Sequence, residues 1–108
     1  MEYYGWDIGG AHLKLARLNA HGDIVDVRQV PCALWQGLAQ LDGALAALDL
    51  PAERTTALHA ITMTGELCDL FADRRDGVRQ ILGHFLPRLG SRVRARVYAG
   101  AAGWLTPV

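Results

Sequence analysis

The spacing of hydrophobic residues changes at Leu34, and this change limits the folds that the chain can adopt. Before it, residues 3–8, 13–18 and 24–30 have the composition of strands and are separated by turn-forming residues. After it, leucines recur every three or four positions, at 34, 38, 41, 45 and 48, which predicts an amphipathic helix closed by a proline. We expect Trp35 to anchor this helix in the core. The chain therefore combines a β-meander with helices.

The second half alternates between strand and helix patterns. Residues 58–64 are typical of a short buried strand, and a helix-like stretch follows from Thr64 to Phe71. An apolar stripe over 78–89 predicts a helix with Asp73 and Asp76 at its start and a late proline, Pro87, that bends or ends it. Alternation over 92–98 predicts another strand, and the remaining small-residue tail reads as a loop.

This order of elements predicts an α/β fold in a single domain. Three antiparallel strands followed by strand–helix units imply a mixed sheet with helices on at least one face. At 108 residues the chain is long enough for one hydrophobic core and too short for two.

The amino-acid composition limits which binding partners and which cellular compartment we expect for the protein. Basic and acidic residues are equal in number, so overall charge gives no case for nucleic acid or an anionic membrane. The sequence has no apolar run long enough for a membrane span and no signal-peptide pattern. Cys32 and Cys68 lack zinc-ligand spacing and are expected to be reduced, buried residues. We therefore expect a cytoplasmic protein.

The segment from Asp7 to Lys14 has two interpretations. Gly9 and Gly10 expose backbone N–H groups that can form an anion-binding concavity, while Asp7 can hold hydrated Mg²⁺ and Lys14 can neutralise a phosphate oxygen. Alternatively, the glycines only form a hairpin turn and the two charged side chains are solvated. His12, beside the glycines, is either a ligand contact or a solvated residue.

Residues 4–11, followed by two antiparallel strands and a helix, resemble the first phosphate motif of the actin-like ATPase superfamily. This superfamily includes sugar kinases, heat-shock chaperone ATPases and hydantoinase/oxoprolinase A proteins. The resemblance implies a ribonuclease H-like half-domain, with Asp7 as a catalytic and metal-binding residue. It also implies that Gly9, Gly10, Ala11, His12 and Lys14 bind the phosphorylated ligand or cofactor.

Together, residues 5–14, 61–71 and 76–78 resemble one branch of that superfamily more specifically. It contains the hydantoinase/oxoprolinase-like proteins linked to tetrahydromethanopterin-dependent one-carbon transfer, which are related to the methanofuran-biosynthesis condensing enzyme. This resemblance implies a Mg²⁺-dependent condensation of a phosphorylated or pyrophosphorylated small molecule with an amine. An ATP-dependent kinase, a hydantoinase-type hydrolase and a non-catalytic scaffold are the alternatives.

One position departs from the family pattern. Related hydantoinases carry a hydroxyl residue directly after the two glycines, whereas this chain has Ala11. A hydroxyl contact to phosphate is therefore lost, and Lys14 is expected to supply part of the anion contact. This departure makes ordinary ATP hydrolysis a weaker expectation.

Glu66 follows Gly65 at a predicted strand-to-helix turn and is the second candidate catalytic residue. If the turn faces the same cleft as Asp7, Glu66 can act as a general base, orient the incoming amine or hold metal. Alternatively, Thr64 caps the helix and Glu66 only favours its positive end.

The remaining polar residues are expected to be structural. His59 and His84 lie in a predicted strand and a predicted helix without evident partners. The row of Arg92, Arg94 and Arg96 is expected to form a solvated or interdomain strand face rather than a nucleic-acid site.

The family resemblance also implies a missing half. Members bind phosphate or nucleotide between two similar lobes, so residues 1–108 correspond to one N-terminal lobe, and the C-terminal lobe is an expected partner. We expect the isolated chain to have no turnover, since half a cleft cannot exclude water or hold both reactants. Apolar surface near Trp104 and Leu105 is then expected to be solvated or to form a homo-oligomer contact.

Overall fold

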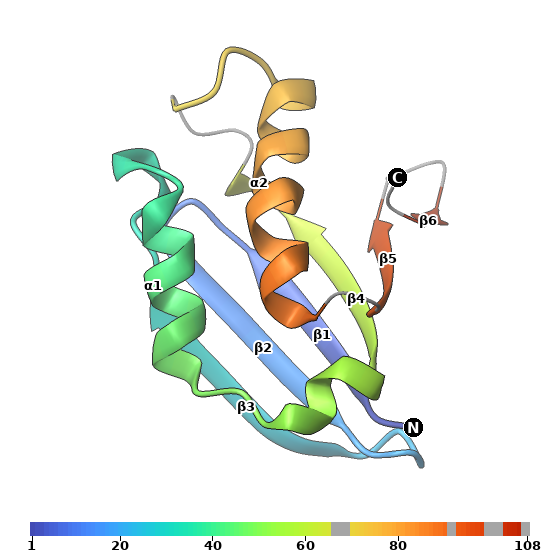
Figure 1. The fold of residues 1–108 in the computed structure, drawn as a ribbon. Helices are drawn as coiled ribbons and strands as arrows, with labels where there is room; N and C mark the ends of the chain where they lie inside the picture. The colour runs from blue at the N-terminus through green and yellow to red at the C-terminus, as the bar shows by residue number, and fades with distance from the viewer. Residues whose placement is uncertain (66–69, 91–92, 99–102, 107–108) are drawn as a thin grey trace.

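The computed structural model describes residues 1–65, 70–90, 93–98 and 103–106, which form a mixed sheet and two α-helices (Figure 1). The strands are β1 (Tyr3–Ile8), β2 (His12–Leu18), β3 (Ile24–Pro31), β4 (Leu58–Met63), β5 (Arg94–Tyr98) and β6 (Trp104–Leu105). The helices are α1 (Ala39–Leu48) and α2 (Arg74–Leu89), with short 3-10 helices at Leu34–Gln36 and Ala52–Thr56.

The sheet has the strand order β3-β2-β1-β4-β5-β6. β1 is antiparallel to β2 and parallel to β4, and β4 is parallel to β5. β3 is antiparallel to β2, and β6 is antiparallel to β5. This arrangement confirms the predicted α/β fold, with a mixed sheet of three antiparallel strands followed by strand–helix units.

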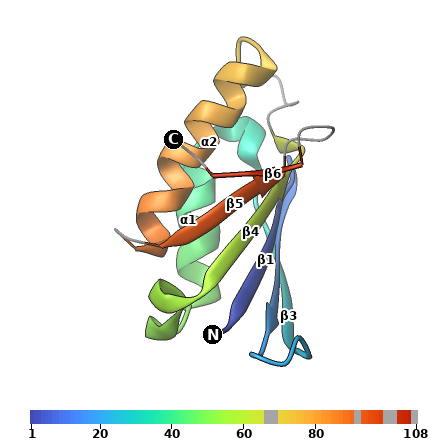
Figure 2. The ribbon, with the colours of Figure 1, turned by 90° about the vertical axis from the view of Figure 1, so that its right-hand side faces the viewer.

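Both α-helices cover the same face of the sheet (Figure 2). The alternating residues Tyr4, Trp6 and Ile8 of β1 are buried on that face, as the period of two requires. Trp6 meets Phe85 of α2 edge to face, with ring centroids 4.9 Å apart. No helix among the described residues is long and apolar enough to cross a membrane. Asp7 alternates with these buried residues along β1 and therefore lies on the other face of the sheet.

Among the residues that the structure describes, the core has one buried polar side chain, that of His59. The indole N–H of Trp6 donates to His59 Nδ1 over 3.0 Å, and His59 Nε2 lies 2.7 Å from the carbonyl oxygen of Arg54. Because an indole nitrogen can only donate, Nδ1 is the acceptor and Nε2 carries the proton. His59 is therefore a structural residue, but it has two partners that the sequence did not reveal. Burial lowers its pKa.

The predicted helix over 34–48 begins later than its leucine pattern suggests. Gly37 has φ 136°, which ends the 3-10 turn over Leu34–Gln36, and α1 starts only at Ala39. Leu34 is fully buried, and its N–H donates to the carbonyl oxygen of Gly10. Trp35 is 61% exposed, so the prediction that it anchors the helix in the core is wrong.

The second half matches its predicted elements with several corrections. Asp73 caps α2, Asp76 lies in its first turn, and Pro87 lies inside the helix, which continues to Leu89. The tail expected to be a loop contains β6. Residues 66–69 of the predicted 64–71 helix lie outside the described residues, whereas Leu70 and Phe71 are not helical.

Two other expectations concern which strand residues are exposed to solvent. Arg94 and Arg96 are exposed, in agreement with a solvated strand face, and Arg92 lies outside the described residues. Trp104 and Leu105 are 52% and 49% exposed.

Candidate functional site

Asp7 lies next to the end of β1, on the face of the sheet that the helices do not cover. It pairs in register with Lys14 of β2 and with Thr62 of β4. Asp7 Oδ2 and Lys14 Nζ are 3.9 Å apart, and both side chains are about half-exposed. The structure therefore brings together the two charged residues that the sequence assigns to metal and phosphate.

The hairpin between β1 and β2 is closed by the N–H of Gly9, which donates to the carbonyl oxygen of His12 over 3.0 Å. Its tip is Gly10-Ala11, one residue later than the glycine pair suggests. Carbonyl oxygens of both tip residues accept hydrogen bonds from the segment after β3, Gly10 from Leu34 and Ala11 from Cys32. Within the described part of the chain, the tip N–H groups have no acceptor. Such N–H groups on an anchored turn can receive an anion.

A second glycine segment lies directly against this hairpin. The N–H of Thr64 donates to the carbonyl oxygen of Ile8 over 3.0 Å. A Cβ atom at Gly65 would lie 2.6 Å from Leu34 Cδ2 and 3.4 Å from the carbonyl oxygen of Gly9. A Cβ atom at Gly9 would lie 3.2 Å from the carbonyl oxygen of His12. Residues more than fifty positions apart therefore meet because glycine removes the side chains that would separate them.

The other predicted site residues have different outcomes. His12 is exposed at the start of β2, beside the hairpin tip. Glu66 lies outside the described residues, so its placement relative to Asp7 stays a prediction. The residue before it, Gly65, is buried against the hairpin.

The described residues contain no group of three or more His, Cys, Asp or Glu side chains that could hold a metal ion by themselves. Asp7 is thus a single carboxylate, with the exposed Thr62 beside it on β4. This donor set suits Mg²⁺, which usually keeps several waters and binds through one or two carboxylates plus substrate phosphates. It does not suit zinc, which requires several nitrogen or sulfur ligands.

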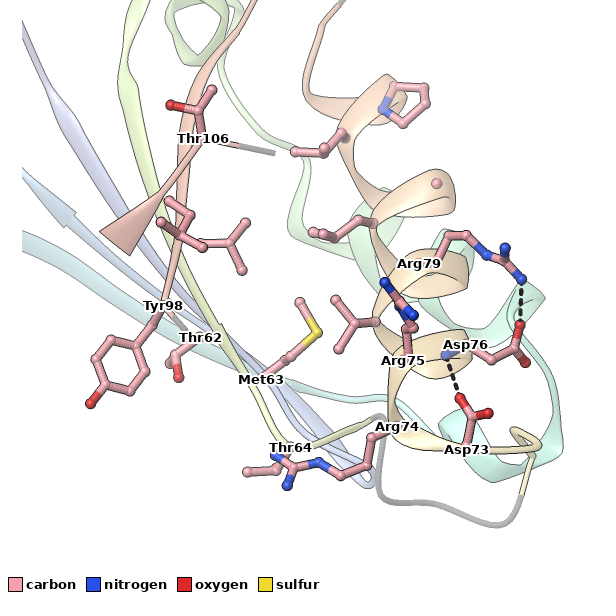
Figure 3. A pocket seen from close by; sticks show the side chains of 17 residues that line it. Thr62, Met63, Thr64, Asp73, Arg74, Arg75, Asp76, Arg79, Tyr98 and Thr106 are labelled. Atoms are coloured by element: carbon pink, nitrogen blue, oxygen red, sulfur yellow. Dashed lines mark hydrogen bonds and ion pairs between the residues drawn. The ribbon is translucent and has the colours of Figure 1, made fainter. Parts of the chain in front are cut away.

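A cavity of about 1410 Å³ is lined in part by Thr64, the residue after β4 whose N–H donates to Ile8 beside the β1–β2 hairpin. It lies between α2 and strands β4 to β6, on the face of the sheet that the helices partly cover (Figure 3). Figure 3 shows Met63 projecting toward its centre. Apolar residues of α2 also line the cavity, namely Val78, Leu82 and Leu86.

The polar rim of this cavity is formed by the beginning of α2. Arg74, Arg75 and Arg79 lie there together with Asp73 and Asp76. Asp73 accepts from the N–H of Asp76, and Asp76 accepts from Arg79 over 2.9 Å. The hydrogen bond from Arg79 lowers the pKa of Asp76. Sequence reasoning used the aspartates as a helix start and missed the arginines, although the adjacent Arg74 and Arg75 were a visible signal.

Comparison with known proteins finds similar solved structures. No family model matches the chain, and no curated protein matches it. A Ppx/GppA family member from Aquifex aeolicus is 14% identical with a TM-score of 0.49, covering 90% of this chain and 35% of its own. An exopolyphosphatase from Cytophaga hutchinsonii is 12% identical with a TM-score of 0.47, covering 94% and 35%.

A putative 2-dehydro-3-deoxygalactonokinase from Sinorhizobium meliloti is 23% identical with a TM-score of 0.35, covering 56% of this chain and 20% of its own. The names of these three proteins are those of a Ppx/GppA family member, an exopolyphosphatase and a kinase, and none of them names a hydantoinase or a methanofuran-biosynthesis enzyme. This chain spans about a third of the length of the Aquifex aeolicus and Cytophaga hutchinsonii proteins.

Proposed function

We propose that the chain is one lobe of a phosphate-handling enzyme and that the β1–β2 hairpin is its phosphate site. In this proposal the N–H groups of Gly10 and Ala11 bind phosphate oxygens. Lys14 neutralises the charge of the phosphate and Asp7 carries hydrated Mg²⁺, while Gly9 and Gly65 let the two glycine segments pack closely beside the site. His12 lies at the margin of the site, where it can contact a larger ligand.

The observation that carries this proposal is the pairing of Asp7 with Lys14 next to an anchored turn whose tip N–H groups have no acceptor among the described residues. An ordinary hairpin does not need an acidic and a basic residue paired next to its turn. It also does not need a second glycine-containing segment packed against it. The site also lies at the carboxyl ends of parallel strands β1 and β4, where open α/β sheets commonly bind ligands.

Mg²⁺ fits the chemistry of these residues. The Asp7 carboxylate and the phosphate oxygens are hard donors of the kind that the ion prefers. When bound, Mg²⁺ would withdraw charge from the phosphate and stabilise a departing phosphate group. Lys14 would contribute in the same direction and would turn from Asp7 toward the ligand.

The reaction itself needs residues beyond the described lobe. We propose that a C-terminal lobe closes over the hairpin and the adjoining cavity, and that Glu66 acts there as a base or orients the second reactant. A half-site open to water cannot hold both reactants, so residues 1–108 alone would bind phosphate without turnover.

The experiment is calorimetric titration of the full-length protein with ATP, pyrophosphate and inorganic tripolyphosphate, with and without Mg²⁺. Asp7→Asn removes the charge that would hold the ion and keeps the shape of the side chain. We expect Mg²⁺-dependent binding that falls about tenfold or more in Asp7→Asn, since the lost interaction involves a charged group.

Asp23→Asn is the matched control, because Asp23 is an exposed aspartate in the hairpin at the other end of β2. It should bind like the unaltered protein. If no phosphate ligand binds, or if Asp7→Asn and Asp23→Asn bind equally well, the hairpin is only a turn and the scaffold alternative is favoured.

The same titration separates the finer proposals. The family resemblance favours phosphate- or pyrophosphate-dependent condensation in one-carbon cofactor metabolism, in which the site holds a leaving group. A preference for pyrophosphate over ATP would support that chemistry. A preference for ATP, with release of ADP or inorganic phosphate, would instead support a kinase or a hydantoinase-type hydrolase.

A further inference from the structure

β3 lies at one edge of the sheet and exposes hydrophobic side chains. In the sheet order it follows β2, and no other described strand pairs with its outer side. Ile24, Val25 and Val27 are 66%, 54% and 69% exposed, respectively. Figure 1 shows β3 along one border of the sheet. A long edge strand with apolar side chains is a template for pairing with another strand.

The register of β3 identifies the backbone groups that face outward. The N–H of Cys32 donates to the carbonyl oxygen of Ala11, so the backbone N–H of Cys32 points toward the β2 side of its strand. Antiparallel pairs alternate between hydrogen-bonded and non-hydrogen-bonded, so Arg28 and Asp26 direct their backbone groups toward β2. By the same alternation, Val27 and Gln29 direct their N–H and carbonyl groups away from the sheet.

The sequence around Val27 is complementary to itself. An antiparallel pair centred on this residue would place Val27 opposite Val27 and would place Asp26 of one copy opposite Arg28 of the other. Within one chain these two residues already form an ion pair, with Arg28 Nε 2.7 Å from Asp26 Oδ2. Both are partly exposed, so a second copy could join them into a network of four alternating charges.

We propose that two copies of this chain associate through β3, so that their two β3 strands pair in antiparallel fashion. The two copies would be related by a two-fold axis that passes between their Val27 residues and is perpendicular to the sheet. The two outward-facing Val27 residues would exchange N–H to carbonyl hydrogen bonds, and their side chains would meet on the face without helices. The sheets would become continuous, and α1 of each copy would lie on the same side of the joint. This contact is independent of the phosphate site.

The ends of β3 limit such pairing to its middle. Pro31 has no N–H, and the register with β2 shifts between Arg17 and Leu18, where β3 has an extra residue. Both features protect an edge from unlimited strand addition. They leave Asp26, Val27, Arg28 and Gln29 accessible, which is the segment that the two-fold pairing uses.

The test is sedimentation equilibrium of the 108-residue chain over a wide range of concentrations, with two substitutions at the same position. Val27→Pro removes the outward N–H, whose loss breaks no hydrogen bond to β2, whereas Val27→Thr keeps the N–H and the β-branched shape. We expect dimers for the unaltered chain and for Val27→Thr, and a dissociation constant about tenfold or more higher for Val27→Pro.

A second pair of variants keeps the test decisive if Val27→Pro does not fold. Val27→Lys places like charges opposite each other at the two-fold axis, and Trp35→Lys adds the same charge at another exposed site. Of these two variants, Val27→Lys should dissociate the dimer and Trp35→Lys should not. Hydrogen exchange of the Val27 amide should slow with concentration in the unaltered chain. A monomer at every concentration, or a dimer that persists in Val27→Lys, would overturn the proposal.

Discussion

Gly65 and Leu34 approach so closely that a Cβ atom at position 65 would lie 2.6 Å from Leu34 Cδ2. Leu34 is fully buried, and the carbonyl oxygen of Ile8 would lie 3.3 Å from the same Cβ atom, so neither side can yield freely. We expect Gly65→Ala to lower the free energy of unfolding by about 1–3 kcal/mol, as overpacked positions do. Urea denaturation measures this loss.

Gly43→Ala is the control for that substitution. Gly43 lies within α1, and a Cβ atom there would meet nothing within 4 Å. Alanine favours a helix by up to about 1 kcal/mol over glycine, so this variant should be as stable as the unaltered chain or more so. If Gly65→Ala is as stable as Gly43→Ala, the approach of Gly65 to Leu34 is not tight in solution.

Much of the fold could be predicted from the sequence because its local patterns agree with its packing. The strands at 3–8, 13–18 and 24–30 are bounded by turn residues and one proline, and the apolar stripe of α2 has capping acids at its start. These are short-range signals, and they survive in the structure.

The features that the sequence did not predict depend on contacts between segments that are distant in the chain. The leucine spacing predicts a helix from Leu34, but Leu34 instead packs against Gly65, and Gly37 turns the chain before α1 begins. No spacing rule reveals that Trp6 and His59 are hydrogen-bonded across neighbouring parallel strands. The pairing of Asp7 with Lys14 follows from the hairpin register, which explains why that part of the site could be predicted.

Trp35 and Trp6 should respond very differently to truncation. Trp35 is 61% exposed, so Trp35→Ala should change the free energy of unfolding by no more than about 0.5 kcal/mol. Trp6 is 2% exposed and contacts Phe85, so Trp6→Ala should cost about 3–5 kcal/mol. Chemical denaturation of both variants checks the contrast. A large loss in Trp35→Ala would show that its side chain is covered in solution.

Cys32 should be unreactive in the folded protein. Its side chain is 2% exposed, and burial raises the pKa of the thiol, which suppresses the reactive thiolate. In a Cys68→Ser background, a thiol reagent should modify Cys32 only after denaturant unfolds the chain. Rapid modification under native conditions would show that this part of the structure opens readily.

His59 should make folding sensitive to mild acid. Its burial and its bonds to Trp6 and Arg54 favour the neutral ring, so its pKa is lower in the folded than in the unfolded state. The unfolded chain then takes up the proton first, as pH falls below the ordinary histidine value of about 6.5. The contribution of the neutral ring to the free energy of unfolding is therefore complete above that pH. It is lost as the pH falls toward the folded-state pKa, and the free energy of unfolding then decreases by at most about 1.4 kcal/mol per pH unit. Urea denaturation across this range measures the slope, and His59→Gln, which retains an acceptor for Trp6, should flatten it. An unchanged slope in His59→Gln would assign the acid sensitivity to another group.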